Sequence, residues 1–501
     1  MDDYYSYDYE TFDTSDTDDY DEMLMKMQYE ENLSELWGNC IEPSITQIMQ
    51  YIIKLVGINF LCRFGWIVLS FCHIPNGEHL ISFLSGWTVL YLVIGYGYIY
   101  LLSFGVISYI LLKFLINFFK PSKKSVKSNA QNFISDAASA VALNENDIKN
   151  KIGYSLGLIC IIGLIICEIS QSNINLWHQI RGIQMILTMK ATSLAFDLDS
   201  KKIIKCPGIL EYFGYLFCPA NCVLGPWIPY EEYQAIFKGS KFNIKWIFWT
   251  LTNIVASLIF LLLSNCFISL LAPSITWKWF SAYKDAFSFR NSHYFVSFLS
   301  QATMTAAGFV NPISNRNYEI SPIFGYIVTK PWTIELPKSL VQIVVNWNIP
   351  MHRWLKTYVF KVIKPHSTAL AIFITYLVSS LLHGLNLQLY AVLLSLGFYT
   401  FVEYKLRQKL ANIFNACISS TDCKRICLHE NKWCTPICLV INIFLSLITV
   451  MHLSYLGVMF EASTSIQEQG YSIEHALNKW KSLDFLSHWT MLFSYIFYLI
   501  I

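Results

Sequence analysis

The sequence has few charged residues. Asp, Glu, Lys and Arg make up 14% of its 501 residues, whereas a soluble globular domain carries about 25%. This shortage excludes an ordinary soluble enzyme. Because 54% of the residues are hydrophobic and several apolar runs exceed about 18 residues, the chain is predicted to be a polytopic helical membrane protein.

The N-terminus lacks the basic segment and following apolar segment of a signal peptide. Residues 1–36 instead hold 13 acidic residues and one Lys. We expect residues 1–45 to form a disordered acidic tail, rich in Tyr and Asp. Residues 46–501 are then predicted to form one membrane domain, whose first helix acts as the targeting signal.

Several functional classes lack their sequence signals. The apolar runs do not alternate with polar residues, which excludes a membrane β-barrel, and no internal repeat supports a repeat-built transporter. No serine-hydrolase elbow, P-loop or dinucleotide fingerprint is present. Lys and Arg flank the apolar runs without forming a stripe, so no nucleic acid partner is expected. Five Cys between residues 417 and 438 fit no compact zinc pattern, and no metal is predicted.

The apolar runs predict an all-α polytopic protein with about nine to eleven transmembrane helices. The run 79–116 is too long for one crossing and contains Gly95-Tyr96-Gly97, where a break would leave the side of the N-terminus open. Basic residues predict a cytosolic location for residues 120–151 and for the loop after the 388–406 span. The predicted spans are 46–72, 79–116, 152–172, 245–272, 293–312, 367–387, 388–406, 436–460 and 486–501.

Three segments do not have the pattern of ordinary spans. Residues 181–199 are predicted to form a helix that mixes charges with apolar residues and is interfacial or lines a cavity. Residues 212–230 are interrupted by Gly and Pro, which at membrane depth requires cover by protein or a water-filled cavity. They are predicted to be re-entrant. Residues 332–361 are too polar to span and are predicted to lie in the interface.

His383 lies inside the apolar run 375–387. A titratable side chain there is costly unless it is paired or functional. On a continuous helix Tyr376 and Ser379 share its face, and Ser380 lies one turn earlier. A neutral imidazole with an ordinary pKa near 6.5 is suited to general base catalysis. The alternative is a structural His, hydrogen-bonded to a neighbouring helix.

Asn348 precedes Pro350 in the polar segment 346–361. An Asn side chain can donate to a developing oxyanion or accept from an imidazole N–H. Asn is also a good N-cap for the helix predicted after it, and from the residues alone the cap is favoured. His352 and His366 lie nearer polar residues and are predicted to be interfacial rather than second bases.

At His383 and Asn348 the chain resembles the membrane-bound O-acyltransferase family. That family places a His in an apolar helix and a partner Asn or Asp in an upstream polar segment. The resemblance extends roughly from the first predicted span to the last, and the acidic tail departs from it. Its most specific blocks are residues 181–197, 223–229, 347–361 and 379–403.

These blocks are most similar to family members that acylate a serine of Wnt proteins. The resemblance implies transfer of a palmitoleoyl group, a cis-monounsaturated C16 chain, from CoA to that serine hydroxyl in the endoplasmic reticulum membrane. It implies a tunnel entered by CoA from the cytosol and by the protein substrate from the lumen, with His383 midway. Palmitoleoyl-CoA is then a substrate, and no cofactor is expected.

The resemblance also assigns roles to residues. His383 would be the general base, and Asn348 would orient it or stabilise the oxyanion, with direct transfer and no acyl-enzyme. Arg353, and less strongly Arg181 and Lys190, would contact CoA phosphates, although each can equally be a snorkelling charge. The residues expected to line the acyl or serine path are Trp347, Tyr376, Ser379 and Leu382.

Three alternatives stay open at this point. A transporter with a proton-relay His would need more intramembrane carboxylates than Glu168 and Glu403. A non-catalytic scaffold that escorts a lipidated ligand would share the tunnel but survive loss of His383. Within the enzyme class, the acceptor could be another secreted protein or a lipid.

Overall fold

The structure is a computed structural model that describes residues 34–72, 74–119, 151–170, 173–239, 244–267, 277–309, 323–421, 429–460 and 473–501. Over these residues the chain is largely helical, and β-pairing is confined to isolated bridge residues, among them the pair Ala416 and Asn431. The predicted all-α class is confirmed. The acidic segment 1–33 lies outside the described residues, whereas residues 34–45, assigned to the tail from the sequence, are helical.

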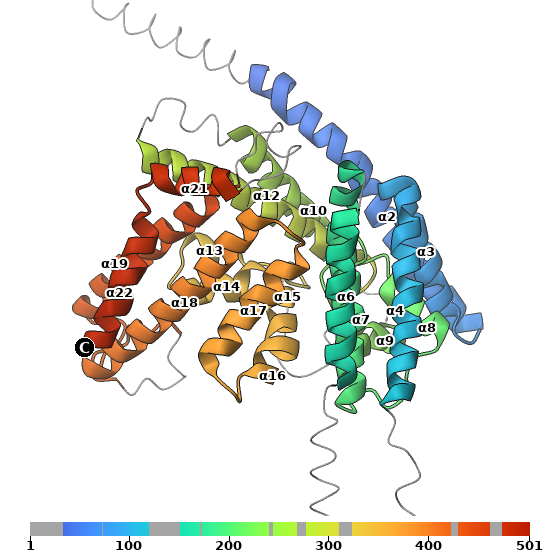
Figure 1. Cartoon of the computed structure of the whole chain (residues 1–501). Helices are drawn as coiled ribbons and strands as arrows, with labels where there is room; N and C mark the ends of the chain where they lie inside the picture. Colours follow the sequence, from blue (N-terminus) through green and yellow to red (C-terminus); the bar gives the residue numbers. More distant parts are fainter. Residues whose placement is uncertain are drawn as a thin grey trace, which may run out of the picture.

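The helices form two groups, joined by α10 (Lys245–Leu262) and η4 (Leu263–Phe267) (Figure 1). The first group, on the right of the figure, contains η1 (Trp37–Ile41), α2 (Glu42–Cys72), α3 (Gly77–Ile94), η2 (Gly95–Gly97), α4 (Tyr98–Phe118), α6 (Lys151–Ser170), α7 (Ile174–Asp199), α8 (Ile209–Leu216) and α9 (Tyr230–Gly239). The second group contains α12 (Lys278–Ala306), α13 (Pro331–Glu335), α14 (Leu340–Trp347), α15 (Ile349–Leu355), η5 (Lys356–Phe360), α16 (Lys361–Ile363), α17 (Thr368–Leu382), α18 (Leu387–Ile413), α19 (Pro436–Gly457), α21 (Ile473–Ser482) and α22 (Leu486–Ile500).

Each group has its own buried core, and a third cluster lies where the groups meet. The first core is built from α2 to α9, and the second from α12 to α22. The third cluster combines Met189 of α7 and Trp227 with Trp354, Tyr358 and Leu382 of the second group. In this cluster Trp354 of α15 and Tyr358 of η5 contact α7, and Leu382 of α17 packs in the same cluster.

Six helical segments are long and apolar enough to cross a membrane, or seven if the bent pair before and after Asp484 is one span, counting only the described part of the chain. Two further predicted spans, α12 and α17, are helical but do not meet the length and hydropathy expected of a membrane-crossing helix. α17 has only 15 residues, and α12 carries buried polar groups such as Arg290 and Asn291. α12 contributes to the second core, whereas α17 packs in the third cluster.

The long run 79–116 breaks where the sequence predicted. α3 ends at Ile94, and Gly95 has a φ of 55°, a left-handed conformation that favours glycine. α4 then begins at Tyr98. The chain thus forms two helices in this run.

The two atypical segments of the first group are covered by protein. α7 is helical as predicted and is almost wholly buried from residue 183 to residue 197, which agrees with an interior rather than an interfacial position. After the short helix α8, residues 217–229 have no regular structure and are almost all buried. Non-helical backbone is tolerated in such a protein only under this kind of cover.

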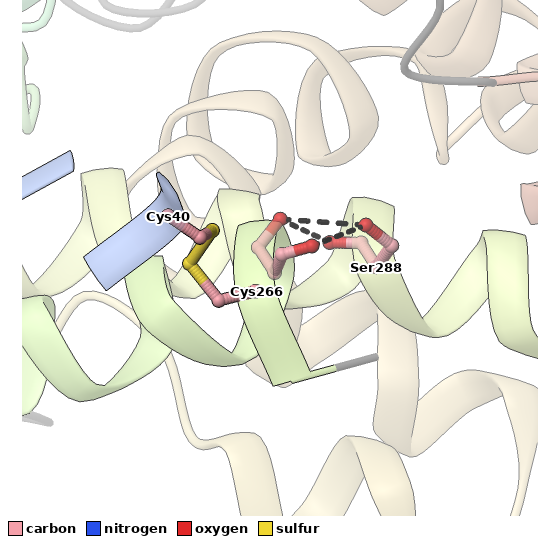
Figure 2. The surroundings of a disulfide bond; sticks show 4 residues. Cys40, Cys266 and Ser288 are labelled. Atoms are coloured by element: carbon pink, nitrogen blue, oxygen red, sulfur yellow. Dashed lines mark hydrogen bonds between the residues drawn. A yellow bond between two sulfur atoms is a disulfide. The ribbon is translucent and has the colours of Figure 1, made fainter. Parts of the chain in front are cut away.

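A disulfide joins Cys40 of η1 to Cys266 of η4 (Figure 2). Next to it, Ser264 and Ser288 donate hydrogen bonds to each other's backbone carbonyl, at 3.0 and 2.9 Å, and tie η4 to α12. The sequence had not singled out this cysteine pair. Cys434 and Cys438 form no disulfide, and Cys423 and Cys427 lie outside the described residues.

Candidate active site

His383 lies at the end of α17 rather than inside it. The helix ends at Leu382, and His383 is its C-cap with φ −85° and ψ 6°. The continuous helix predicted for residues 367–387 is therefore wrong at its end, because Gly384 turns the chain with a φ of 80°. The ring of a C-cap residue is less constrained by its own helix, and it stands at the turn between α17 and α18.

The polar face predicted on α17 points mainly toward α18. A side chain at Gly397 of α18 would meet the Tyr376 ring at 2.7 Å. The Ser380 hydroxyl donates to the Tyr376 carbonyl at 2.9 Å, and Ser379 is buried. The face toward α7 is apolar instead, because Leu382 is fully buried in the third cluster and Val378 packs against it.

Asn348 has the cap role that the residues favoured. It is the N-cap of α15, and its Oδ1 accepts a hydrogen bond from the Met351 N–H at 3.0 Å. The described residues include no hydrogen bond between Asn348 and His383. The cap uses Oδ1 and leaves the Nδ2 donor, so the chemistry open to this side chain is donation.

Trp347 stacks on a histidine that the sequence did not single out. The Trp347 and His293 rings lie 4.2 Å apart with an interplanar angle of 9°. His293 Nε2 also lies 2.9 Å from the Trp347 carbonyl. Trp347 therefore packs against the second core, beside α12, and does not belong to the third cluster.

Arg353 of α15 contacts residues of the first helix group. Its guanidinium forms an ion pair with Glu232 of α9 at 3.1 Å and lies over the Trp227 ring at 5.7 Å. The Arg353 side chain is 33% exposed. Burial raises the pKa of Glu232 to about 7, against the lowering effect of Arg353.

Asp197 of α7 places a buried carboxylate beside Tyr358 of η5. The Tyr358 hydroxyl lies 3.0 Å from each carboxylate oxygen of Asp197, and Lys202 pairs with Asp197 at 2.9 Å. Burial raises the pKa of Asp197, while Lys202 and Tyr358 lower it. The position of Asp197 within the 181–197 block was its only sequence signal. Tyr358 likewise lies within the 347–361 block, but the sequence did not indicate that its helix would contact α7.

Lys190 does not have the predicted role. Its ammonium is fully buried and donates to the carbonyls of Tyr215 and Leu216 and to Asn221 Oδ1, at 3.0, 3.0 and 2.7 Å. All three donors are thus used by protein acceptors at the end of α8. Lys190 is a structural lysine, neither a snorkelling charge nor a phosphate ligand.

No group of three or more His, Cys, Asp or Glu that could hold a metal ion occurs in the described parts of the chain. The residues of the candidate site include His383 at a helix end, Leu382 in the third apolar cluster and the capping residue Asn348. A histidine base beside apolar surface is suited to acyl transfer.

Residues 88–448 match the model of MBOAT, the membrane-bound O-acyltransferase family. The chain belongs to this family and is a multi-pass membrane acyltransferase that uses an acyl-CoA substrate. The family resemblance carried by the four sequence blocks is confirmed.

Individual relatives are more specific. The chain is similar to protein-serine O-palmitoleoyltransferase porcupine of Anopheles gambiae, with 36% identity over 494 residues that cover 94% of each chain. Its identity to the human protein of that name is 35% over 372 residues, which cover 70% of this chain and 79% of the human one. Lysophospholipid acyltransferase 2 of Arabidopsis thaliana is 24% identical over 47% of this chain and 58% of its own.

Proposed function

We propose that this protein transfers a palmitoleoyl group from CoA to a serine hydroxyl of Wnt proteins in the endoplasmic reticulum membrane. The observation that carries the proposal is the 36% identity to a protein-serine O-palmitoleoyltransferase along 94% of the chain. Relatives that act on lysophospholipids match only about half as much of it, at 24% identity.

The proposed chemistry begins at His383. Its imidazole takes the proton of the serine hydroxyl as the serine oxygen attacks the thioester carbon. The carbon–sulfur bond then breaks, an ester forms, and the CoA thiolate leaves and receives the proton from the imidazolium. A thiolate leaves readily, so no acyl-enzyme is needed.

The other proposed residues position the two substrates. Asn348 donates through Nδ2 to the developing oxyanion or to the imidazole, since its Oδ1 is used by the cap. Arg353 contacts the CoA phosphates through its guanidinium. Leu382 and Ser379 lie beside the acyl chain, and Trp347 and Tyr376 border the path of the serine.

The test compares the wild type with His383→Ala, using purified protein, palmitoleoyl-CoA with a terminal alkyne, and a disulfide-closed Wnt hairpin peptide that contains the acceptor serine. Loss of a general base lowers kcat by about a hundredfold or more. His366→Ala is the matched control, because His366 is exposed. It should label the peptide at the wild-type rate.

Two outcomes would contradict the proposal. Equal labelling by His383→Ala and wild type would exclude His383 from the chemistry. If neither labels the peptide while both bind acyl-CoA, the serine of Wnt proteins is not the acceptor, and another secreted protein, a lipid or an escort role takes its place.

A further inference from the structure

A single carboxylate interrupts the otherwise uncharged run that follows Lys151 in α6. Glu168 stands near the end of this helix, after 16 uncharged residues. A carboxylate in such an apolar helix is costly unless it has partners. Its partners identify what it does, and the first of them lies two residues after His383.

The first partner is the backbone of the turn that carries His383. The Leu385 N–H donates to Glu168 Oε2 at 2.5 Å. Within the turn, the His383 N–H donates to the Ser380 carbonyl and the Gly384 N–H to the Leu381 carbonyl. The Leu385 amide is thus bound from outside the turn, by a helix of the other group.

Gly384 makes this close approach feasible. A side chain at Gly384 would collide with the Glu168 carboxylate. Its φ of 80° also favours glycine. The sequence His-Gly-Leu therefore allows α6 to contact the backbone directly after the histidine.

The second partner is Arg181 of α7. Its guanidinium lies 3.5 Å from Glu168 Oε1, with side-chain exposures of 26% for Arg181 and 16% for Glu168. Glu168 holds this charge in an ion pair while its other oxygen holds the turn.

We propose that Glu168 is a positioning residue for His383, acting through the Leu385 amide. The inference rests on the proposed role of His383 as the base. α17 ends at Leu382, so its helical hydrogen bonds do not fix the ring of the next residue. The contact with α6 supplies the missing constraint, and it requires a hydrogen-bond acceptor at position 168 rather than a charge.

The first experiment needs no substrate. Hydrogen exchange is measured on the full-length protein in detergent for wild type, Glu168→Ala, Glu168→Gln and Gly163→Ala. Gly163 lies on the same helix with no atom near its Cβ position, so Gly163→Ala is the matched control. We expect faster exchange of residues 383–386 in Glu168→Ala alone. Unchanged exchange in that variant overturns the proposal.

The second experiment measures kcat and KM for acyl transfer in the same variants, with acyl-CoA binding as a check of folding. Misplacing a catalytic group by about 1 Å can cost a hundredfold, so Glu168→Ala should lower kcat by at least about tenfold. Glu168→Gln keeps an acceptor oxygen and should stay within about threefold of wild type.

The outcomes separate the two proposals. An equal loss in Glu168→Ala and Glu168→Gln would show that the charge matters rather than the backbone contact, and would overturn the positioning role. Normal kcat in Glu168→Ala would do the same. If the wild type labels no serine peptide, the proposed acceptor fails, while hydrogen exchange still decides whether Glu168 holds the turn.

Discussion

At the scale of single residues, the side chain of Asn348 has two roles, one structural and one proposed for catalysis. Its Oδ1 caps α15, and its Nδ2 is the donor proposed for the reaction. The two uses can be separated because a serine hydroxyl also caps a helix well but cannot replace the amide donor. Thermal stability then reports on the capping Oδ1 of Asn348, and kcat reports on its Nδ2 donor.

We expect Asn348→Ser to keep the thermal stability of the wild type but to lower kcat by about a hundredfold, the effect of removing an oxyanion donor. Asn348→Ala should lose both, with a stability cost of about 1 kcal/mol for the missing cap. Scanning fluorimetry and the peptide labelling assay measure the two quantities. Full activity in Asn348→Ser would leave Asn348 with its cap role alone.

At the scale of elements, buried charges hold the short segments of the second group together. Arg407 of α18 is 1% exposed and donates to the carbonyls of Ile418 and Lys338 at 2.8 and 2.7 Å. It also pairs with Glu403 at 3.0 Å, and Glu403 accepts the Leu340 N–H that begins α14. This network connects α18 to the segment that leads to Asn348.

Arg407→Met should destabilise the protein by about 3–5 kcal/mol, because it leaves the Glu403 carboxylate buried without its partner. The measurement is thermal unfolding in detergent by intrinsic fluorescence. Lys405→Met removes the same charge from the same helix at a less buried position and should unfold near the wild-type temperature. Similar unfolding of all three proteins would show that the network adds no net stability.

At the scale of the whole molecule, two independent features point to one orientation in the membrane. Disulfides such as Cys40–Cys266 persist in an oxidising compartment, which under the proposed function is the lumen of the endoplasmic reticulum. In Figure 1 the first helical residues lie at the top, and the ends of α4 and α6 that flank the Lys-rich segment lie at the bottom. Lys-rich loops stay cytosolic, so the N-terminus is expected in the lumen.

Glycosylation tests this orientation. The chain has a sequon at Asn32-Leu33-Ser34, and Asp13→Asn creates a second one, farther from the first helix, that ends at Ser15. We expect a glycosidase-sensitive mass increase for Asp13→Asn in microsomes. Ile134→Ser, which creates a sequon beginning at Asn132, should remain unmodified. The opposite pattern would place the tail in the cytosol and Cys40 in a reducing environment.

The sequence by itself determined the helical membrane class, the break at Gly95–Gly97, the family blocks and the two candidate catalytic residues. These follow from local properties, namely apolar run length, glycine conformation and the cost of a His in an apolar run. The tertiary structure decided the rest. The turn after α17 is bound by Glu168, which lies 217 residues before Leu385 in the chain. The Lys190 ammonium is bound by the Tyr215 carbonyl, 25 residues away. The partners of Cys40, His293 and Arg353 lie 226, 54 and 121 residues away in the chain. One sequence alone does not indicate which distant residues will come into contact.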